Sequence, residues 1–260
     1  MKKIIFMELI RFIKSIRIIF DIIFYFDRFL KTFKHKRYLN NKNLVIIGGS
    51  KLDKKKLNYY TNKKKIYVAT LNLYALTKLS KKLIPDFYCL MDPGCFNLKN
   101  KIVIKILKYV KKHNIYLVLP IQINNEFLNY LKKIKITKIL YINSSTSRIL
   151  NFINPLLPKS FSGMTILSLL SFSLYLNAKK IYIIGFRSDT FRTSILFKKK
   201  HFKVRYESWN RIIHGNFVKL DEFLLGFGHF FSDCYRFEKR FPKRIFNLDN
   251  KSYITSFKKL

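Results

Sequence analysis

Short apolar runs that alternate with helical patterns constrain the fold of this chain more than any other feature. From residue 43 onward each run is continuous, which is typical of a strand buried between two layers of helices. The stretches between the runs have the spacing of amphipathic helices, so parallel strands joined by helical crossovers are expected. The sequence therefore predicts an α/β fold with a doubly wound, mostly parallel sheet. The expected strands are 44–47, 66–71, 87–91, 115–119, 139–142, 180–186 and 244–248, and the expected helices are 73–83, 99–112, 124–133, 163–177 and 218–240.

The charge balance is strongly basic. Against 52 Lys and Arg residues stand 14 Asp and Glu residues, a net charge of +38, while 49% of the chain is hydrophobic. Such a hydrophobic content excludes a disordered chain, and the charge predicts attraction to polyanions. An A/T-rich coding sequence would also enrich Lys, Ile, Asn, Phe and Tyr together, so both origins of the charge stay open. No nucleic-acid-binding motif accompanies it, and we expect no specific nucleic-acid partner.

The cysteines and the acidic residues give no sign of a metal centre. Cys89, Cys95 and Cys234 have neither a disulfide framework nor the spacing of zinc ligands. No paired-aspartate motif of the kind that binds a metal and a nucleotide sugar is present. The sequence therefore predicts that no metal is used.

The first forty residues are apolar but interrupted by charges. No window is long and uncharged enough to span a bilayer. Arg11, Lys14, Asp21 and Arg28 fall near one helical face, and apolar residues cover most of the rest. Such a basic amphipathic helix suits an anionic membrane surface, although packing on the domain core or on a partner chain stays open, as does a homo-oligomer. We expect residues 1–38 to form this helix and a linker, residues 39–260 to form the α/β domain, and the protein to be cytoplasmic and peripheral on the inner face of the cell membrane.

Polar and glycine residues follow several of the expected strands. In open α/β sheets, ligands bind outside the carboxyl ends of the strands, so these residues are candidates for the site. Some of them have a plainer alternative: a tight turn for the two glycines, a helix cap for Asn72 and a turn residue for Asp92. The candidates are Gly48, Gly49, Ser50, Asn72, Asp92, Arg187 and Asp189, joined by Lys159, Ser162 and Gly163 before the helix expected at 163.

Histidine offers two candidates for a general base. His214 stands in a loop-like context. His229 follows closely after two glycines, Gly226 and Gly228. A near-neutral imidazole suits proton removal from a sugar hydroxyl. A structural role stays open for both.

Four segments in this order resemble a known bacterial family: residues 45–50 with Asn72, residues 85–93, residues 162–185 and residues 244–252. The chain resembles the lipooligosaccharide sialyltransferases of glycosyltransferase family 42, and also the related Rossmann-like domain of MptE-like pyrophosphokinases and flagellin-glycosylation accessory proteins. The resemblance covers about residues 43–256. It implies a Rossmann-like fold that handles a nucleotide-activated substrate.

The resemblance also implies roles for the candidates. The turn at Gly48–Ser50 would lie under the nucleotide, and Asn72 and Asp92 would face the donor sugar and ribose. Lys159 stands where the family has an Arg for the donor, while Ser162 and Gly163 would meet the cytidine side. His229 matches the family's base best. The donor would be a nucleotide sugar, such as CMP-sialic acid, as substrate and without a cofactor.

Two functions from different classes remain open at this point. One is a metal-independent, sialyltransferase-like glycosyltransferase that acts on a cell-surface glycan at the membrane. The other is an accessory module or diphosphokinase in glycan or flagellin modification. The second would need acids for Mg²⁺, for which Asp92 and Asp189 are the candidates.

Overall fold

The strands form one parallel sheet, as the sequence predicts. The computed structural model describes residues 20, 23–49, 52–62, 66–142, 165–186 and 220–260, with side chains left undescribed at 93 and 220–229. Within this part the sheet has eight strands in the order β5-β4-β3-β2-β1-β6-β7-β8, and every neighbouring pair is parallel. The strands are β1 (Asn43–Ile47), β2 (Ile66–Leu71), β3 (Phe87–Cys89), β4 (Tyr116–Pro120), β5 (Ile139–Ile142), β6 (Ile181–Ile184), β7 (Ile245–Asn247) and β8 (Lys258–Lys259).

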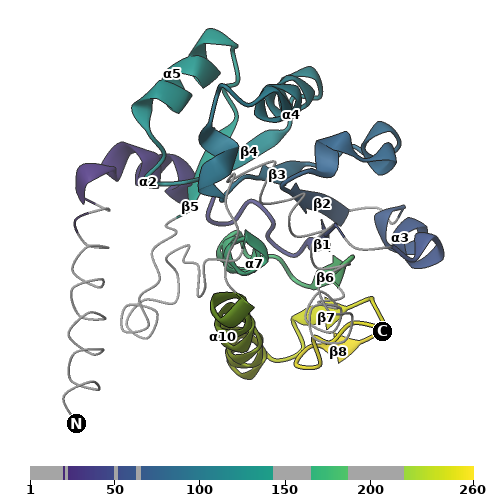
Figure 1. Ribbon diagram of the computed structural model, residues 1–260. Helices are drawn as coiled ribbons and strands as arrows, with labels where there is room; N and C mark the ends of the chain where they lie inside the picture. Colours follow the sequence, from purple (N-terminus) through teal and green to yellow (C-terminus); the bar gives the residue numbers. More distant parts are fainter. Residues whose placement is uncertain (1–19, 21–22, 50–51, 63–65, 143–164, 187–219) are drawn as a thin grey trace.

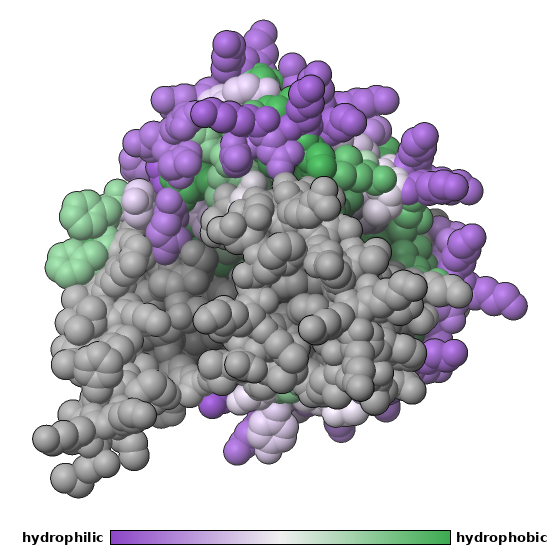
Figure 2. Space-filling model, viewed as in Figure 1, coloured by the Kyte–Doolittle hydropathy of each residue, from purple (hydrophilic) through white to green (hydrophobic). Residues whose placement is uncertain are grey.

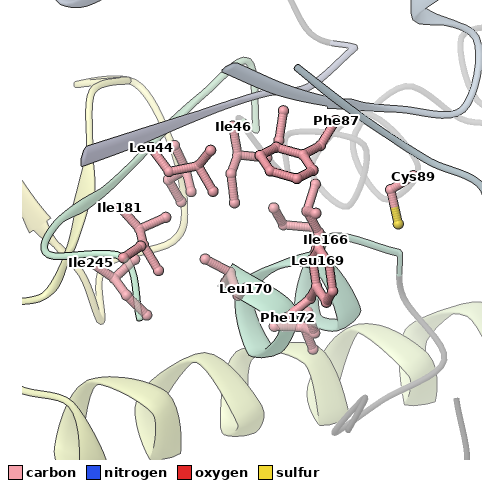
Figure 3. Packing of buried hydrophobic residues seen from close by; sticks show 14 of the residues in the cluster. Leu44, Ile46, Phe87, Cys89, Ile166, Leu169, Leu170, Phe172, Ile181 and Ile245 are labelled. Atoms are coloured by element: carbon pink, nitrogen blue, oxygen red, sulfur yellow. The ribbon is translucent and has the colours of Figure 1, made fainter. Parts of the chain in front are cut away.

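Helices cover both faces of this sheet (Figure 1). Alternate residues of β1 face opposite layers: Leu44 and Ile46 pack with α7 and α10, whereas Val45 and Ile47 pack with the helices of the other face. Figure 3 shows the first layer, with Phe172 of α7 directed toward the strands. The helices are α2 (Phe26–Phe33), α3 (Lys54–Thr61), η1 (Tyr74–Leu76), η2 (Lys78–Lys81), η3 (Pro93–Phe96), α4 (Lys101–Lys112), α5 (Asn125–Lys133), α7 (Thr165–Tyr175) and α10 (Leu220–Arg240).

Local sequence signals explain where the crossover helices begin and end. Asn100 caps α4 and Asn124 caps α5, each through its side-chain oxygen. After α4, α5 and α7 the chain turns through residues with positive φ, at Asn114 (52°), Lys135 (62°) and Asn177 (61°). A left-handed residue after a helix closes its last turn and redirects the chain, here back toward the amino edge of the sheet.

Three local predictions are wrong or incomplete. The helix expected at 73–83 is two short 3-10 helices, because Thr77 between them is extended and its hydroxyl caps η2. Helix α3, which the sequence does not predict, begins with the lysine run at 54–56, where the Asp53 side chain accepts hydrogen bonds from two backbone amides. Strand β8 is not visible in the sequence, because its two lysines are exposed and pair through the backbone alone.

Helix α2 packs on the edge strand β5 and is part of the fold (Figure 1). The Thr32 hydroxyl, 1% exposed, accepts a hydrogen bond of 2.7 Å from the Tyr141 amide. The Arg28 guanidinium donates to the carbonyls of Ile121 (2.7 Å) and Ile123 (2.8 Å). The described end of the segment 1–38 therefore covers the sheet, while residues 1–19 lie outside the described residues and their membrane role stays a prediction.

Candidate functional site

The direction of chain progress reverses between β1 and β6. From β1 the chain moves through β2 to β5 on one side, and it then returns to place β6 to β8 on the other. In parallel α/β sheets this reversal leaves the carboxyl ends of the two central strands free of a shared crossover, and ligands bind there. The structure thus selects the residues that follow β1 and β6, together with those that follow β2, the other neighbour of β1.

Two glycines bring the ends of β1 and β6 into contact. A Cβ atom on Gly48 would lie 2.4 Å from the carbonyl oxygen of Gly185, and one on Gly185 would lie 2.6 Å from a methyl group of Leu52. Gly185 also has φ of +80°, a conformation that favours glycine. Gly48 is therefore required by the contact of its strand with β6 rather than by an open approach to a ligand.

Gly49 differs from Gly48 in its surroundings. A Cβ atom there would meet nothing within 4 Å, and the residue is exposed. The backbone at Gly49 is thus the part of the predicted glycine turn that a phosphate can approach. Ser50, which completes this turn, lies outside the described residues.

A buried polar network holds the turn after β6. The Asp249 carboxylate, 3% exposed, accepts hydrogen bonds from the amides of Gly185 (2.6 Å) and Phe186 (3.1 Å). The Ser252 hydroxyl donates to the Phe186 carbonyl at 2.7 Å, and the Asn247 side chain accepts from the Asp249 amide at 3.0 Å. Charge-assisted bonds of this kind are strong, so the C-terminal segment fixes the turn at Gly185 and Phe186. The closing sequence motif contains Asn247 and Ser252, but sequence reasoning gave no role to Asp249.

Unpartnered polar atoms gather at the end of β2. Asn72 has φ of 54°, and its carbonyl accepts a hydrogen bond from the Tyr88 hydroxyl. Leu73, and not Asn72, occupies the cap position of η1, so the helix-cap alternative does not hold. The Asn72 Oδ1 atom and the Thr70 Oγ1 atom are buried and have no hydrogen-bond partner within the described residues. Burying such atoms costs free energy unless a partner is supplied, so both are candidate contacts for a polar ligand.

Asp92 follows β3 at the same edge. Its carboxylate caps η3 and accepts a hydrogen bond of 3.0 Å from the Gly94 amide. The turn role that the sequence allowed is thus present, and a contact with the donor stays a prediction. Since β1, β2 and β3 are neighbours, the structure brings Gly49, Asn72 and Asp92 to one edge of three adjacent strands.

His229 lies in the middle of α10, whose later residues Phe230, Cys234 and Phe237 pack against the sheet. The helix ends at Arg240, near the amino end of β7. At 1.5 Å per residue, position 229 stands about 16 Å from that end, and the five residues of β1 span about the same distance. From this length we expect the backbone at 229 to lie level with the carboxyl edge.

The remaining candidates cannot be placed from the described structure. They are Lys159, Ser162, Gly163, Arg187, Asp189 and His214, all of which lie outside the described residues.

Metal and thiol chemistry find no support in the described part of the chain. No group of three His, Cys, Asp or Glu residues suited to a metal ion occurs there. The three cysteines are buried, and burial raises the pKa of each thiol, to about 12 for Cys95. Neutral thiols are poor nucleophiles, so these cysteines serve packing.

No family model matches the chain, and a search of curated proteins gives no match. Comparison with solved structures finds Campylobacter sialyltransferases. A variant of alpha-2,3/8-sialyltransferase CstII has a TM-score of 0.45 and 12% identity, and the match covers 84% of this chain and 86% of that one. The monofunctional alpha-2,3-sialyltransferase Cst-I from Campylobacter jejuni has a TM-score of 0.46 and 14% identity, covering 84% and 80%. CST-II in complex with a trisaccharide acceptor and CMP has a TM-score of 0.44 and 13% identity, covering 84% and 85%.

Proposed function

We propose that the protein is a sialyltransferase-like glycosyltransferase that moves a sugar from a CMP-linked donor to a cell-surface glycan. The observation that carries the proposal is the carboxyl edge at the β1–β6 reversal. There the open backbone of Gly49 follows β1, and the neighbouring strand β2 ends in two buried polar atoms without a partner, Thr70 Oγ1 and Asn72 Oδ1. A nucleotide sugar would supply phosphate to the first and hydroxyl groups to the second.

The proposed reaction is a direct transfer without a metal. His229, with His214 as the reserve, would take the proton from the acceptor hydroxyl as its oxygen bonds to the anomeric carbon. The bond from that carbon to the phosphate breaks, and CMP leaves with the electron pair. Basic groups such as Lys159 and Arg187 would stabilise the charge that develops on the phosphate. Ser50, Ser162, Gly163 and Asp189 would complete the donor contacts.

The acceptor is proposed to be a lipooligosaccharide-type glycan at the inner face of the cell membrane. The strongly basic composition supports this location, because the cytoplasmic leaflet is anionic.

A thermal-shift panel with CMP, UDP, GDP and ATP tests the donor class. We expect CMP to raise the melting temperature without Mg²⁺, because a ligand that binds only the folded state stabilises it. A shift that occurs only with ATP and Mg²⁺ would contradict the proposal and favour the diphosphokinase class.

A matched pair of asparagine variants locates the CMP contact. Asn72→Gly removes a buried, unpartnered amide oxygen at the carboxyl edge, and glycine still adopts the positive φ of this position. Asn43→Ala removes a buried, unpartnered amide oxygen at the amino end of β1. Loss of one hydrogen bond should raise the Kd for CMP about fivefold in the first variant. The second variant should bind like the unaltered protein, and equal effects in both would remove Asn72 from the site.

A further inference from the structure

Large apolar side chains are exposed along the segment that leads into and through α2. Figure 2 shows apolar surface at the left margin of the view, where Figure 1 draws the beginning of α2. Scattered exposed apolar residues are normal, but a cluster on one element marks an interaction surface. The exposed fractions are 51% for Phe20, 64% for Ile23, 77% for Phe24, 53% for Phe26 and 48% for Phe33.

The opposite side of this segment is firmly attached to the domain. Phe29 and Tyr25 pack against the core, and Thr32 is buried against β5. Arg28 donates to two carbonyls after β4, and its guanidinium lies 4.5 Å from the centre of the Tyr25 ring. The exposed rings are therefore held facing away from the domain by contacts on the other side of the helix.

The contacts of α2 also give its direction. Thr32 lies level with Tyr141 inside β5, whereas Arg28 lies level with Ile121, just beyond the carboxyl end of β4. On the other side of Thr32, the Tyr38 ring meets Phe87 and Tyr116, which begin β3 and β4. The helix thus runs opposite to the strands, and its beginning lies at the carboxyl edge, where the candidate site is.

The charge around the exposed apolar side chains indicates that their partner is an anionic membrane surface. Exposed basic residues follow the apolar cluster at Lys31, Lys34 and Arg37, against the exposed Asp27 within α2. Residues 1–19 contain five Lys or Arg residues against the single Glu8. A face that combines large apolar side chains with basic ones is typical of helices that lie in an anionic membrane interface. None of the helices in the described part of the chain has both the length and the hydrophobicity to span a bilayer.

We propose that the exposed apolar side chains of residues 20 and 23–33 insert into the surface of an anionic bilayer and turn the carboxyl edge of the sheet toward the lipid. The insertion adds an orientation to the proposed action at the membrane. It depends on the proposed function only for the identity of the acceptor. A site at that edge would receive a lipid-linked acceptor from the membrane and a nucleotide donor from the solvent.

Vesicle sedimentation of the full chain tests the insertion, without donor or acceptor. Vesicles of phosphatidylcholine with phosphatidylglycerol should bind the protein, and vesicles of phosphatidylcholine alone should bind it weakly. The double variant Phe20→Ser/Phe24→Ser should lose at least about tenfold in partition coefficient, because each ring loses its burial in the interface. The control is Leu76→Ser/Ile84→Ser, which changes side chains exposed to 44% and 49% elsewhere and should bind normally.

Two results would overturn the insertion. One is equal sedimentation of the Phe20→Ser/Phe24→Ser variant and the unaltered chain. The other is light scattering that shows a dimer without lipid, abolished by the same two substitutions, with vesicle binding unchanged. The exposed face would then be covered by a second copy of the chain.

The orientation is tested by a matched pair of labels on α5. Since the native cysteines are buried, a fluorophore will attach selectively to Glu126→Cys, at the carboxyl edge, or to Lys133→Cys, near the amino edge; both positions are exposed. Lipids brominated in their acyl chains should quench the first label more strongly than the second. Equal quenching, or the reverse order, would overturn the orientation. All of these results are independent of whether CMP binds.

Discussion

Gly48→Ala is expected to destabilise the protein by about 3 kcal/mol or more. The added methyl group would lie 2.4 Å from the Gly185 carbonyl oxygen and 2.8 Å from the Phe186 ring. Since the first neighbour is backbone, relief requires β6 to move away from β1, and overpacking of this kind costs about 1–3 kcal/mol or more. Both strands are central in the sheet, so the loss affects the whole domain and not the site alone. Urea denaturation measures the change.

Gly49→Ala is the matched control for this prediction. A methyl group there has open space, so the free energy of unfolding should change by less than about 0.5 kcal/mol. If both variants unfold at the same urea concentration as the unaltered protein, the close contact between β1 and β6 is not as described. If Gly49→Ala weakens CMP binding while the fold is intact, the open half of the turn belongs to the donor site.

His229→Ala is expected to lower turnover about 10²–10⁴-fold, the usual contribution of a positioned general base. Binding of CMP should be nearly unchanged, because the base acts on the acceptor hydroxyl and not on the nucleotide. The pH–rate profile should also lose its acidic limb, which protonation of the histidine base would create. Initial rates of sugar transfer across the pH range provide the measurement.

His214→Ala is the control, and it should retain turnover and the acidic limb. The opposite result, with His214→Ala inactive and His229→Ala active, would move the base to the segment before α10. Full activity of both variants would contradict a histidine base, and another group would have to take the proton from the acceptor hydroxyl.

The sheet could be predicted from the sequence because its strands are buried on both faces. A run such as Ile181–Ile184 is apolar at every position, and a short run of this kind between helical patterns is typical of a strand in a covered parallel sheet. Helix α3 escaped prediction because only Leu57 on it is buried, so no apolar stripe marks it. The single helix predicted over 73–83 is wrong for the opposite reason. The apolar residues of this segment have helical spacing, but the extended Thr77 divides it into two short helices.

The candidate site was only partly predictable. Residues at strand ends follow from the topology, and Gly49, Asn72 and Asp92 do lie at one edge. What the sequence could not show is which glycine faces another strand, because that depends on the contact between Gly48 and Gly185, far apart in the chain. The role of Asp249 has the same origin, since its partners are 64 and 63 residues away. Arg28 was predicted on the polar face of a membrane helix, yet its charge is used to bind carbonyls after β4.

Hydrogen exchange of the full chain with and without CMP tests the central claim most directly, since it reports where the nucleotide binds. Peptides at the carboxyl edge, around residues 48–49, 70–75 and 184–186, should exchange more slowly when CMP is present. Peptides at the amino edge, around residues 41–44, 84–86 and 113–116, should exchange as before. Protection confined to the amino edge, or no protection at CMP concentrations that raise the melting temperature, would contradict a donor site at the β1–β6 reversal.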